Sequence, residues 1–408
     1  MKIYMKSPLL LAITLSLGIS FSSNSQSTDE ITWQKDIKVA LNEAITKGQL
    51  LFVECFSPTC SHCKAIEPFF KNSEVAKMYN TNFVNYKLDI TNKDQLTFLT
   101  ERDIRLPSWP RFLFFDGNGN LIHQSTVEPS IESINGIALR AMDPKHQAAD
   151  FAKRFSEGDR AIEFLIEYAS FNRVIQDATV SIPIENAIFK SFGKEDLGST
   201  KSWEITKACI TDIDNGFAKY WFNHVKEARE IEKTKGTPGA ENGVFQGLIQ
   251  GSLYGSRGKN YSFNKLQEVR ELIIQIGSAQ YADNLLWEFE IKALVKDGNF
   301  PDALAIGNKM TSKFQGNSSA QIYITGFFND FFSDKSYIES AKGWLENALP
   351  GLSKSKVKAE YYYEMARLHE NSGDRTEALL NAINAKEFAK ASGSDSAKFD
   401  ELISQFRK

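Results

Sequence analysis

The strongest constraint on the fold lies in Leu51–Lys64, which reads LFVECFSPTCSHCK. Its apolar start predicts a buried strand, and the Ser-Pro-Thr turn that follows leads into a helix opening at Cys60. Cys60 and Cys63 are three residues apart, so on the first turn of a helix their Cβ atoms lie about 5–6 Å from each other. A disulfide favours a Cα separation of about 5.5 Å, so this pair can open and close a bond with little backbone movement.

The position of Cys60 also favours reactivity. The positive end of the helix dipole stabilises a thiolate over a thiol. The sequence therefore predicts a redox-active pair. Two alternatives stay open: a permanent disulfide, and half of a zinc site completed by scattered Cys and His residues elsewhere.

Composition places the chain among ordered globular proteins. Its 408 residues are 42% hydrophobic and 12% aromatic, with 30 Phe and a net charge of −3. This is enough apolar material for two or three domains with their own cores. The near-neutral charge gives no indication of nucleic-acid binding, and the hydrophobicity excludes a disordered chain.

The first residues have the pattern of a signal peptide over residues 1–25. Lys2 and Lys6 precede a short apolar run, Pro8–Ile19, and small residues supply a cleavage site after Ser25. The run is too short for a permanent anchor, so we expect no membrane span after cleavage. A buried N-terminal helix is the alternative. Export would be to the periplasm or the exterior of a bacterium.

Four cysteines are too few for a disulfide-stapled scaffold in a chain of this length. In an exported protein one Cys-x-x-Cys then points to exchange chemistry. The two remaining cysteines, Cys55 in the strand and Cys209 on a helical stripe, are expected to be buried apolar residues.

Residues 27–145 alternate between helical and strand patterns. The expected helices are Trp33–Lys47, a helix from Cys60 kinked at Pro68, Ser73–Tyr79, Asp94–Arg102 and Ser130–Ala141, and the expected strands are Leu50–Phe56, Phe83–Ile90, Arg111–Phe115 and Leu121–Gln124. Asp116–Asn120 predicts a hairpin turn. The alternative, a calcium loop, lacks the glycine and glutamate that such a loop requires at its sixth and twelfth positions.

This order resembles the thioredoxin fold, an α/β domain with a central mixed sheet flanked by helices. Residues 54–64 are similar to the active-site segment of protein disulfide isomerases, in which an acid, a Pro, Cys-x-His-Cys and a Lys stand at the same offsets. Thr59 departs from the Trp that commonly precedes the first cysteine. The resemblance implies that Cys60 is the nucleophile and that Cys63 resolves the mixed disulfide.

Two further catalytic residues are expected beside the cysteines. His62 lies between them, where a charged imidazole would stabilise the Cys60 thiolate; a solvated polar residue is the alternative. Glu54 is the one charge in an apolar strand, so burial should raise its pKa. In the family, the acid at this offset relays a proton for the resolving cysteine. An edge-strand Glu facing water is the alternative.

The family also has a cis-proline that faces the cysteines just before a hydrophobic strand. Pro110 abuts Arg111–Phe115 directly, and Pro107 is a second candidate. The resemblance implies that the backbone of Trp109 lies beside Cys60 and offers an edge to a client peptide.

Beyond residue 145 the pattern is helical throughout. Residues 146–282 show no strict repeat and predict a helical domain or linker, with loops at Gly236–Gly239 and Gly251–Gly258. Residues 283–408 resemble tetratricopeptide-type repeats, with three units over 283–392. The residues that carry this resemblance are Trp287, Gly298, Ala303, Ala341, Tyr362, Met365, Ala366, Gly373, Ala378, Ala382 and Ala385.

We therefore expect an exported thiol–disulfide oxidoreductase of the protein disulfide isomerase type that needs no cofactor and no metal. Its partners would be client proteins with thiols or disulfides, a redox recycling partner, and a peptide or protein held on the concave surface of the helical region. The alternative is a cell-envelope adaptor whose thioredoxin-like domain is only a scaffold. A helical region that merely stabilises the redox domain also stays open.

Overall fold

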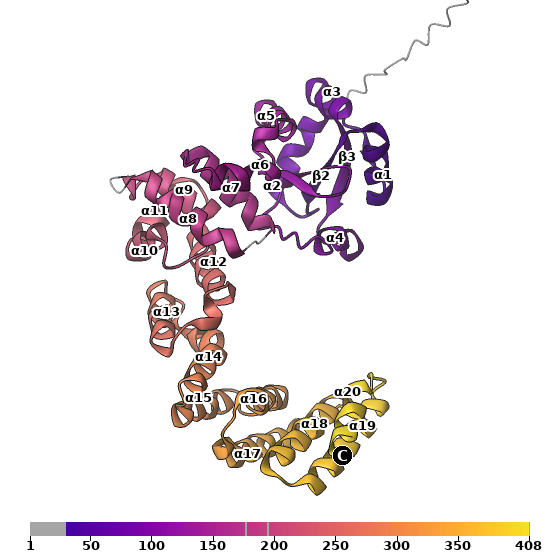
Figure 1. Ribbon diagram of the computed structural model, residues 1–408, viewed down its shortest axis with the longest axis vertical. Coiled ribbons are helices and arrows are strands. Elements are labelled where there is room, and N and C mark those ends of the chain that lie inside the picture. Colours follow the sequence, from indigo (N-terminus) through magenta and orange to yellow (C-terminus); the bar gives the residue numbers. More distant parts are fainter. Residues whose placement is uncertain (1–29, 176–177, 194–195, 408) are drawn as a thin grey trace, which may run out of the picture. The chain divides into compact units, whose positions relative to one another are not determined.

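A computed structural model describes residues 30–175, 178–193 and 196–407 (Figure 1). The signal peptide predicted over residues 1–25 lies outside the described residues. The described chain forms two compact units, one that extends to Glu157 and one that begins at Gly158. The finer boundary at residue 282 stays a prediction.

The N-terminal unit is built on a five-stranded sheet in the order β1-β3-β2-β4-β5. β1, β2 and β3 are parallel, whereas β4 runs antiparallel to both β2 and β5. The mixed sheet flanked by helices that the sequence predicted is confirmed. Its elements are β1 (Trp33–Gln34), α1 (Ile37–Lys47), β2 (Leu50–Phe56), α2 (Ser61–Ile66), η1 (Glu67–Lys71), α3 (Ser73–Asn82), β3 (Phe83–Asp89), α4 (Lys93–Thr100), β4 (Arg111–Phe115), β5 (Leu121–Thr126), α5 (Ile131–Met142), η2 (Pro144–His146) and α6 (Ala148–Ser156).

The start of the first helix differs from the prediction. Trp33 forms strand β1, opposite Asn85 of β3, and α1 begins only at Ile37. The helix begins there because the Asp36 side chain accepts hydrogen bonds from the first free backbone N–H groups. It ends as predicted at Gly48, whose φ of 63° is a left-handed conformation that suits glycine.

The central strand β2 is covered on both faces, and one face carries an aromatic cluster. The Phe52 ring lies 4.7 Å from that of Tyr79 and 4.8 Å from that of Phe112, centroid to centroid. Each such pair adds about 1 kcal/mol beyond the apolar area that it buries. This rigid core fixes the end of β2, from which the Cys60 segment departs.

The helix after Cys60 changes character at Pro68, as predicted. α2 ends at Ile66 and continues as the 3-10 helix η1, with the proline in its first turn. A proline has no backbone N–H and its ring crowds the preceding turn, so it disfavours the continuation of a regular α-helix.

The second unit is helical throughout its described residues. Its elements are α7 (Ile162–Ile175), α8 (Ala178–Phe192), α9 (Thr200–Cys209), α10 (Gly216–Asn223), α11 (Val225–Thr234), α12 (Ala240–Tyr254), η4 (Gly258–Asn260), α13 (Phe263–Gln275), α14 (Ala279–Lys296), α15 (Phe300–Lys313), α16 (Ser318–Phe331), η5 (Lys335–Tyr337), α17 (Ile338–Ala348), η6 (Leu349–Gly351), α18 (Ser355–Ser372), α19 (Arg375–Ala391) and α20 (Ala397–Phe406). No helix among these or in the first unit is long and apolar enough to cross a membrane, within the described ranges.

Three helix pairs occupy the positions of the predicted repeat units: α14 with α15, α16 with α17, and α18 with α19. The equivalent residues Ala303, Ala341 and Ala378 are fully buried in the second helix of each pair. Small side chains at these positions let the paired helices approach closely.

One predicted loop in the second unit is largely helical. α12 continues through Gly251 to Tyr254, so only Gly255–Gly258 lies outside it. A Cβ atom on Gly251 would lie 2.7 Å from the Thr211 carbonyl oxygen. This glycine therefore serves close packing against a neighbouring loop, and the prediction of a turn at this residue was wrong.

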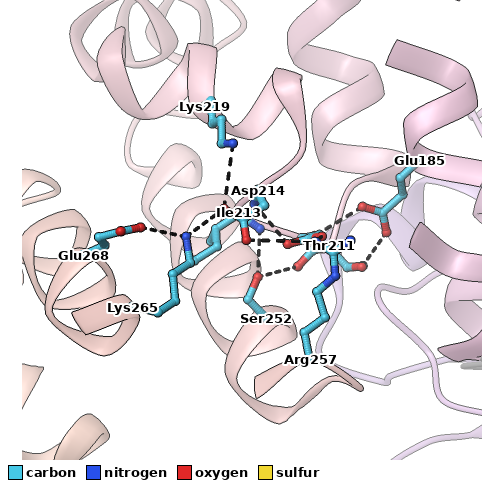
Figure 2. A network of polar contacts seen from close by, with 10 residues as sticks. Glu185, Thr211, Ile213, Asp214, Lys219, Ser252, Arg257, Lys265 and Glu268 are labelled. Carbon is cyan, nitrogen blue, oxygen red and sulfur yellow. Dashed lines mark hydrogen bonds and ion pairs between the residues drawn. The ribbon is translucent and has the colours of Figure 1, made fainter. Parts of the chain in front are cut away.

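A polar network holds that neighbouring loop, residues 210–215, against α8, α12 and α13 (Figure 2). The buried carboxylate of Asp212 accepts a hydrogen bond of 2.7 Å from Arg257. Lys265 of α13 makes a matching contact of 2.7 Å with Asp214. These ion pairs fix the loop between α9 and α10.

The same network contains a buried acid, Glu185 of α8. It accepts hydrogen bonds from the Thr211 hydroxyl at 2.5 Å and from the Asp212 backbone N–H at 3.2 Å. Burial raises the pKa of Glu185 to about 7, although these hydrogen bonds act in the opposite direction. The network thus joins helices that are far apart in the sequence.

Candidate active site

Cys60 and Cys63 are brought together at the start of α2. Cys60 is the N-cap residue of the helix, and its Sγ accepts a hydrogen bond of 3.1 Å from the backbone N–H of Cys63. Both are free thiols in this structure. Cys60 is partly exposed, whereas Cys63 is 5% exposed. The accessible sulfur, that of Cys60, is therefore the one that accepts a hydrogen bond from a helical N–H.

Cys63 is held in its protonated form. Burial, and then the hydrogen bond to Cys60, raise the pKa of Cys63 to about 12. The backbone of Ser57 acts in the opposite direction and the charge of Glu54 adds to the rise. The two thiols thus differ in both access and environment, which is the asymmetry that separates an attacking sulfur from a resolving one.

The turn before Cys60 is closed by local hydrogen bonds. The backbone N–H of Cys60 donates to the Ser57 carbonyl at 3.1 Å, and the Ser57 hydroxyl lies 3.1 Å from that of Thr59. Ser57 is buried and Thr59 is exposed. Thr59, the departure from the family pattern, therefore helps to shape the turn and leaves the approach to Cys60 without a bulky indole.

A cis peptide bond joins Trp109 to Pro110. The Trp109 carbonyl oxygen lies 3.9 Å from the Cys60 Sγ. Pro110 is buried, whereas the other candidate, Pro107, is exposed. The Trp109 side chain is 46% exposed. The structure therefore places Trp109 and Pro110 beside Cys60, where an edge for a client backbone was expected.

Glu54 is buried within β2, as predicted, so the alternative of an exposed edge carboxylate does not apply. Its side chain is 2% exposed and forms an ion pair with Lys87 at 3.5 Å. Burial raises the pKa of Glu54 to about 7, and the charge of Lys87 limits the rise. The carboxylate oxygen that faces Lys87, Oε2, makes this ion pair and no further hydrogen bond with a described residue. A group with this pKa can take up or release a proton near neutral pH.

Lys87 is the partner that sequence reasoning missed. It lies directly opposite Glu54 in the register of β2 and β3. Its ammonium group also contacts Glu67 at 3.3 Å and lies 5.3 Å from the ring centroids of Trp33 and Phe70. A signal existed, because Lys87 is the one cation in the strand Phe83–Asp89. Only the strand register identifies it as the partner of Glu54.

Arg111 is a second buried charge that the sequence did not single out. It follows Pro110 directly and is 4% exposed. Its guanidinium donates to Gln124 of β5 and, at 3.3 Å, to the hydroxyl of Ser108. Arg111 thus links the segment that carries Trp109 to the sheet beneath it.

His62 is exposed on the first turn of α2, next to the buried Cys63. It lies between the cysteines in sequence, and its effect on the Cys60 thiolate stays a prediction. Cys55 and Cys209 are both buried, and burial raises the pKa of each thiol, that of Cys209 to about 12. Across the described ranges, no group of three or more His, Cys, Asp or Glu side chains is placed to hold a metal ion.

The sheet order, the helix that starts at Cys60 and the adjacent Cys60–Cys63 pair define a thioredoxin-like domain. Residues 33–135 match the family model of thioredoxin, which covers the sheet, both cysteines and the Trp109–Pro110 bond. No curated protein matches the chain. The N-terminal unit is therefore a scaffold of the thiol–disulfide oxidoreductase type, followed by a helical region.

Proposed function

We propose that the protein is an exported thiol–disulfide oxidoreductase that exchanges disulfides with client proteins through Cys60 and Cys63. The observation that carries the proposal is the hydrogen bond of 3.1 Å from the Cys63 backbone N–H to the Cys60 Sγ. It places a stabilising donor on the more accessible of two neighbouring sulfurs. A domain kept only as a scaffold has no need of this arrangement.

In the reducing direction the cycle has two steps. The Cys60 thiolate attacks a client disulfide, which forms a mixed disulfide and releases the first client sulfur as a thiolate. Cys63 then loses its proton and attacks the Cys60 sulfur, which forms the Cys60–Cys63 disulfide and releases the second client thiolate. The client gains two electrons and the cysteine pair loses two. Oxidation of a client dithiol is the same sequence in reverse.

Glu54 is the proton acceptor that we assign to the second step. Its pKa of about 7 lies near neutral pH, and its charge raises the pKa of Cys63, so the two groups interact through the interior. As a carboxylate Glu54 can accept the proton that Cys63 must lose, and the nearby ammonium of Lys87 compensates its charge until then. His62 is proposed to stabilise the Cys60 thiolate from its exposed position.

Trp109 and Pro110 are proposed to bind the client backbone. The Trp109 carbonyl beside Cys60 offers a hydrogen-bond acceptor to an extended segment on either side of the client cysteine. The helical region is proposed to recruit client proteins or a recycling partner. Export to the periplasm or the cell exterior is part of the proposal, because it would place the pair where disulfides persist.

The test uses the full chain in an insulin-reduction assay with dithiothreitol. Cys60→Ser should abolish catalysed reduction, because no nucleophile remains. Cys63→Ser, once reduced and freed of dithiothreitol, should accumulate a mixed disulfide with the client that resists release. Cys209→Ala is the matched control, since it removes a buried thiol from the other unit and should retain activity. Wild-type activity in Cys60→Ser would overturn the proposal and favour the adaptor alternative.

A further inference from the structure

A groove of about 480 Å³ is lined by residues of three helices of the second unit, α14, α16 and α18. These helices are labelled in Figure 1. These are the first helices of the three pairs. The apolar part of the lining includes Ile322 and Phe327 from α16 and Val357 from α18. A cavity of this size accommodates a few side chains of a bound molecule.

The polar residues of the groove are predominantly acidic. Four carboxylates line it, Glu288, Asp330, Glu360 and Glu364, against one ammonium, Lys356. The intramolecular cations that pair with three of these acids stand outside the lining. Arg367 contacts both Asp330 and Glu364, and Lys398 lies 2.6 Å from Glu360. The groove itself therefore presents oxygen atoms beside apolar side chains.

The walls add two exposed aromatic side chains. Tyr323 is 58% exposed and Phe331 is 43% exposed, although both are on the same helix as the buried Phe327. The ammonium of Lys292 already lies 4.3 Å from the Phe331 ring centroid. This contact shows the chemistry that the wall accepts, because a cation is attracted to the face of an aromatic ring.

Gly326 leaves space for one carboxylate of the groove lining, that of the buried Glu364. It lies inside α16, where a glycine costs about 1 kcal/mol relative to alanine. A Cβ atom at this position would lie 2.8 Å from Oε1 of Glu364. A glycine is therefore needed here because the Glu364 carboxylate occupies the space of a Cβ atom. Since Gly326 has no side chain, Glu364 can line the groove.

We propose that this groove binds an extended segment of an unfolded client protein in which a Lys or Arg side chain stands next to an aromatic or large aliphatic one. The apolar side chain would pack on Ile322 and Phe327, and the cation would lie between the carboxylates and the Phe331 ring. Charge complementarity selects this occupant, because the lining carries four carboxylates against one ammonium, while the cations that pair with three of them, Arg367 and Lys398, lie outside the lining. Such segments would be the clients that the helical region is proposed to recruit, and this inference rests on that proposed function.

The test measures binding of a fluorescein-labelled, cysteine-free peptide, Gly-Ser-Arg-Phe-Arg-Leu-Ser-Gly, to the full chain by fluorescence anisotropy. Two companion peptides replace both Arg by Glu, or Phe by Ser. The Arg-Phe peptide should bind, and its affinity should fall with added salt because its charges are partly exposed. The companions should bind at least about tenfold more weakly. Equal binding of the Glu peptide, or no binding of the Arg-Phe peptide, would overturn the proposal.

Variants locate the binding site. The double variant E288Q/E360Q keeps the side-chain shapes and removes two charges, so affinity for the Arg-Phe peptide should fall about tenfold. Glu339→Gln on α17, whose side chain is 84% exposed, is the matched control and should bind as wild type. Unchanged affinity in E288Q/E360Q would show that the peptide binds elsewhere and would overturn the assignment.

Gly326→Ala tests the role of the glycine, and Gly343→Ala is its control because no atom lies within 4 Å of the added Cβ. Gly326→Ala should weaken binding of the Arg-Phe peptide, and Gly343→Ala should not. Wild-type affinity in a folded Gly326→Ala chain would contradict the assignment of the peptide to this groove. If that variant fails to fold, the charge variants decide. Peptide binding needs no cysteine, so it can be tested separately from insulin reduction. A chain that binds the Arg-Phe peptide but does not reduce insulin would contradict the proposed function and leave the groove assignment intact.

Discussion

Glu54 and Lys87 lie directly opposite each other on β2 and β3, with the ammonium 3.5 Å from the carboxylate. The pair is unequal, since the Glu54 side chain is 2% exposed and that of Lys87 is 26% exposed. At this distance the attraction does not fully compensate the loss of water around Glu54. The result is a buried acid whose pKa is raised to about 7.

Glu54→Gln should make the stability of the N-terminal unit less dependent on pH. The folded pKa of about 7 lies above the ordinary value of 4.5, so the folded state holds a proton that the unfolded state releases between these values. The contribution of Glu54 to the stability of the wild type is therefore fully present below pH 4.5 and is lost as pH rises through 7. The difference amounts to about 3 kcal/mol.

Calorimetric unfolding of the full chain at pH 5 and pH 8 checks this effect. The variant should gain stability relative to wild type at pH 8 and little at pH 5. Glu67→Gln is the control. Glu67 also has its carboxylate near Lys87, but the Glu67 side chain is 60% exposed. An equal gain at both pH values would contradict burial as the cause.

Lys87→Met should move the titration of Glu54 to higher pH. The ammonium lowers the pKa of Glu54 against the effect of burial, so its loss leaves burial unopposed. Lys87→Arg retains the charge and should change the titration little. NMR titration of the Glu54 carboxyl carbon in the labelled full chain measures both. No movement in Lys87→Met would show that the ion pair does not act on Glu54.

Alkylation should distinguish the four thiols of the reduced chain. Cys60 is partly exposed, whereas Cys63, Cys55 and Cys209 are each at most 5% exposed. A reagent needs access to a thiolate, so brief treatment with iodoacetamide at neutral pH should label Cys60 first. Mass spectrometry of the digested protein measures the order, and labelling of Cys63 before Cys60 would reverse the assigned roles.

Arg257→Met should destabilise the second unit by about 2 kcal/mol, because the carboxylate of Asp212 would stay buried without its cation. The partial exposure of Arg257 limits the loss. Lys219→Met is the control, since its ammonium is 63% exposed and 3.8 Å from Asp214 (Figure 2). Thermal unfolding followed by circular dichroism compares the two. Equal melting temperatures would remove the structural role assigned to this network.

The sequence alone predicted the parts of the site that depend on local pattern. The bounds of β2 follow from its continuous apolar run, and the burial of Glu54 follows from its place within that run. The partner of Glu54 could not be predicted, because strand register, not sequence spacing, puts Lys87 opposite it. The short strand at Trp33 was missed for the same reason, since pairing with β3 overrides a helical pattern.

Glycine was the other source of error. The pattern at Gly251 suggests a turn, yet the residue is helical and lies against the Thr211 carbonyl. Gly326 was not singled out from the sequence, and the position of Glu364 on another helix explains it. Both glycines are required by contacts between segments that are distant in the sequence. Such contacts cannot be predicted from the local sequence pattern.

The reduction potential of the Cys60–Cys63 pair tests the central claim most directly. The full chain would be equilibrated in glutathione buffers of graded potential, and the disulfide would be quantified by mass spectrometry after acid quenching. The account predicts one two-electron transition between Cys60 and Cys63 at roughly −270 to −120 mV, the range of thiol–disulfide exchange proteins. A disulfide that stays closed below about −300 mV, as structural disulfides do, or a pair that never closes, would contradict it.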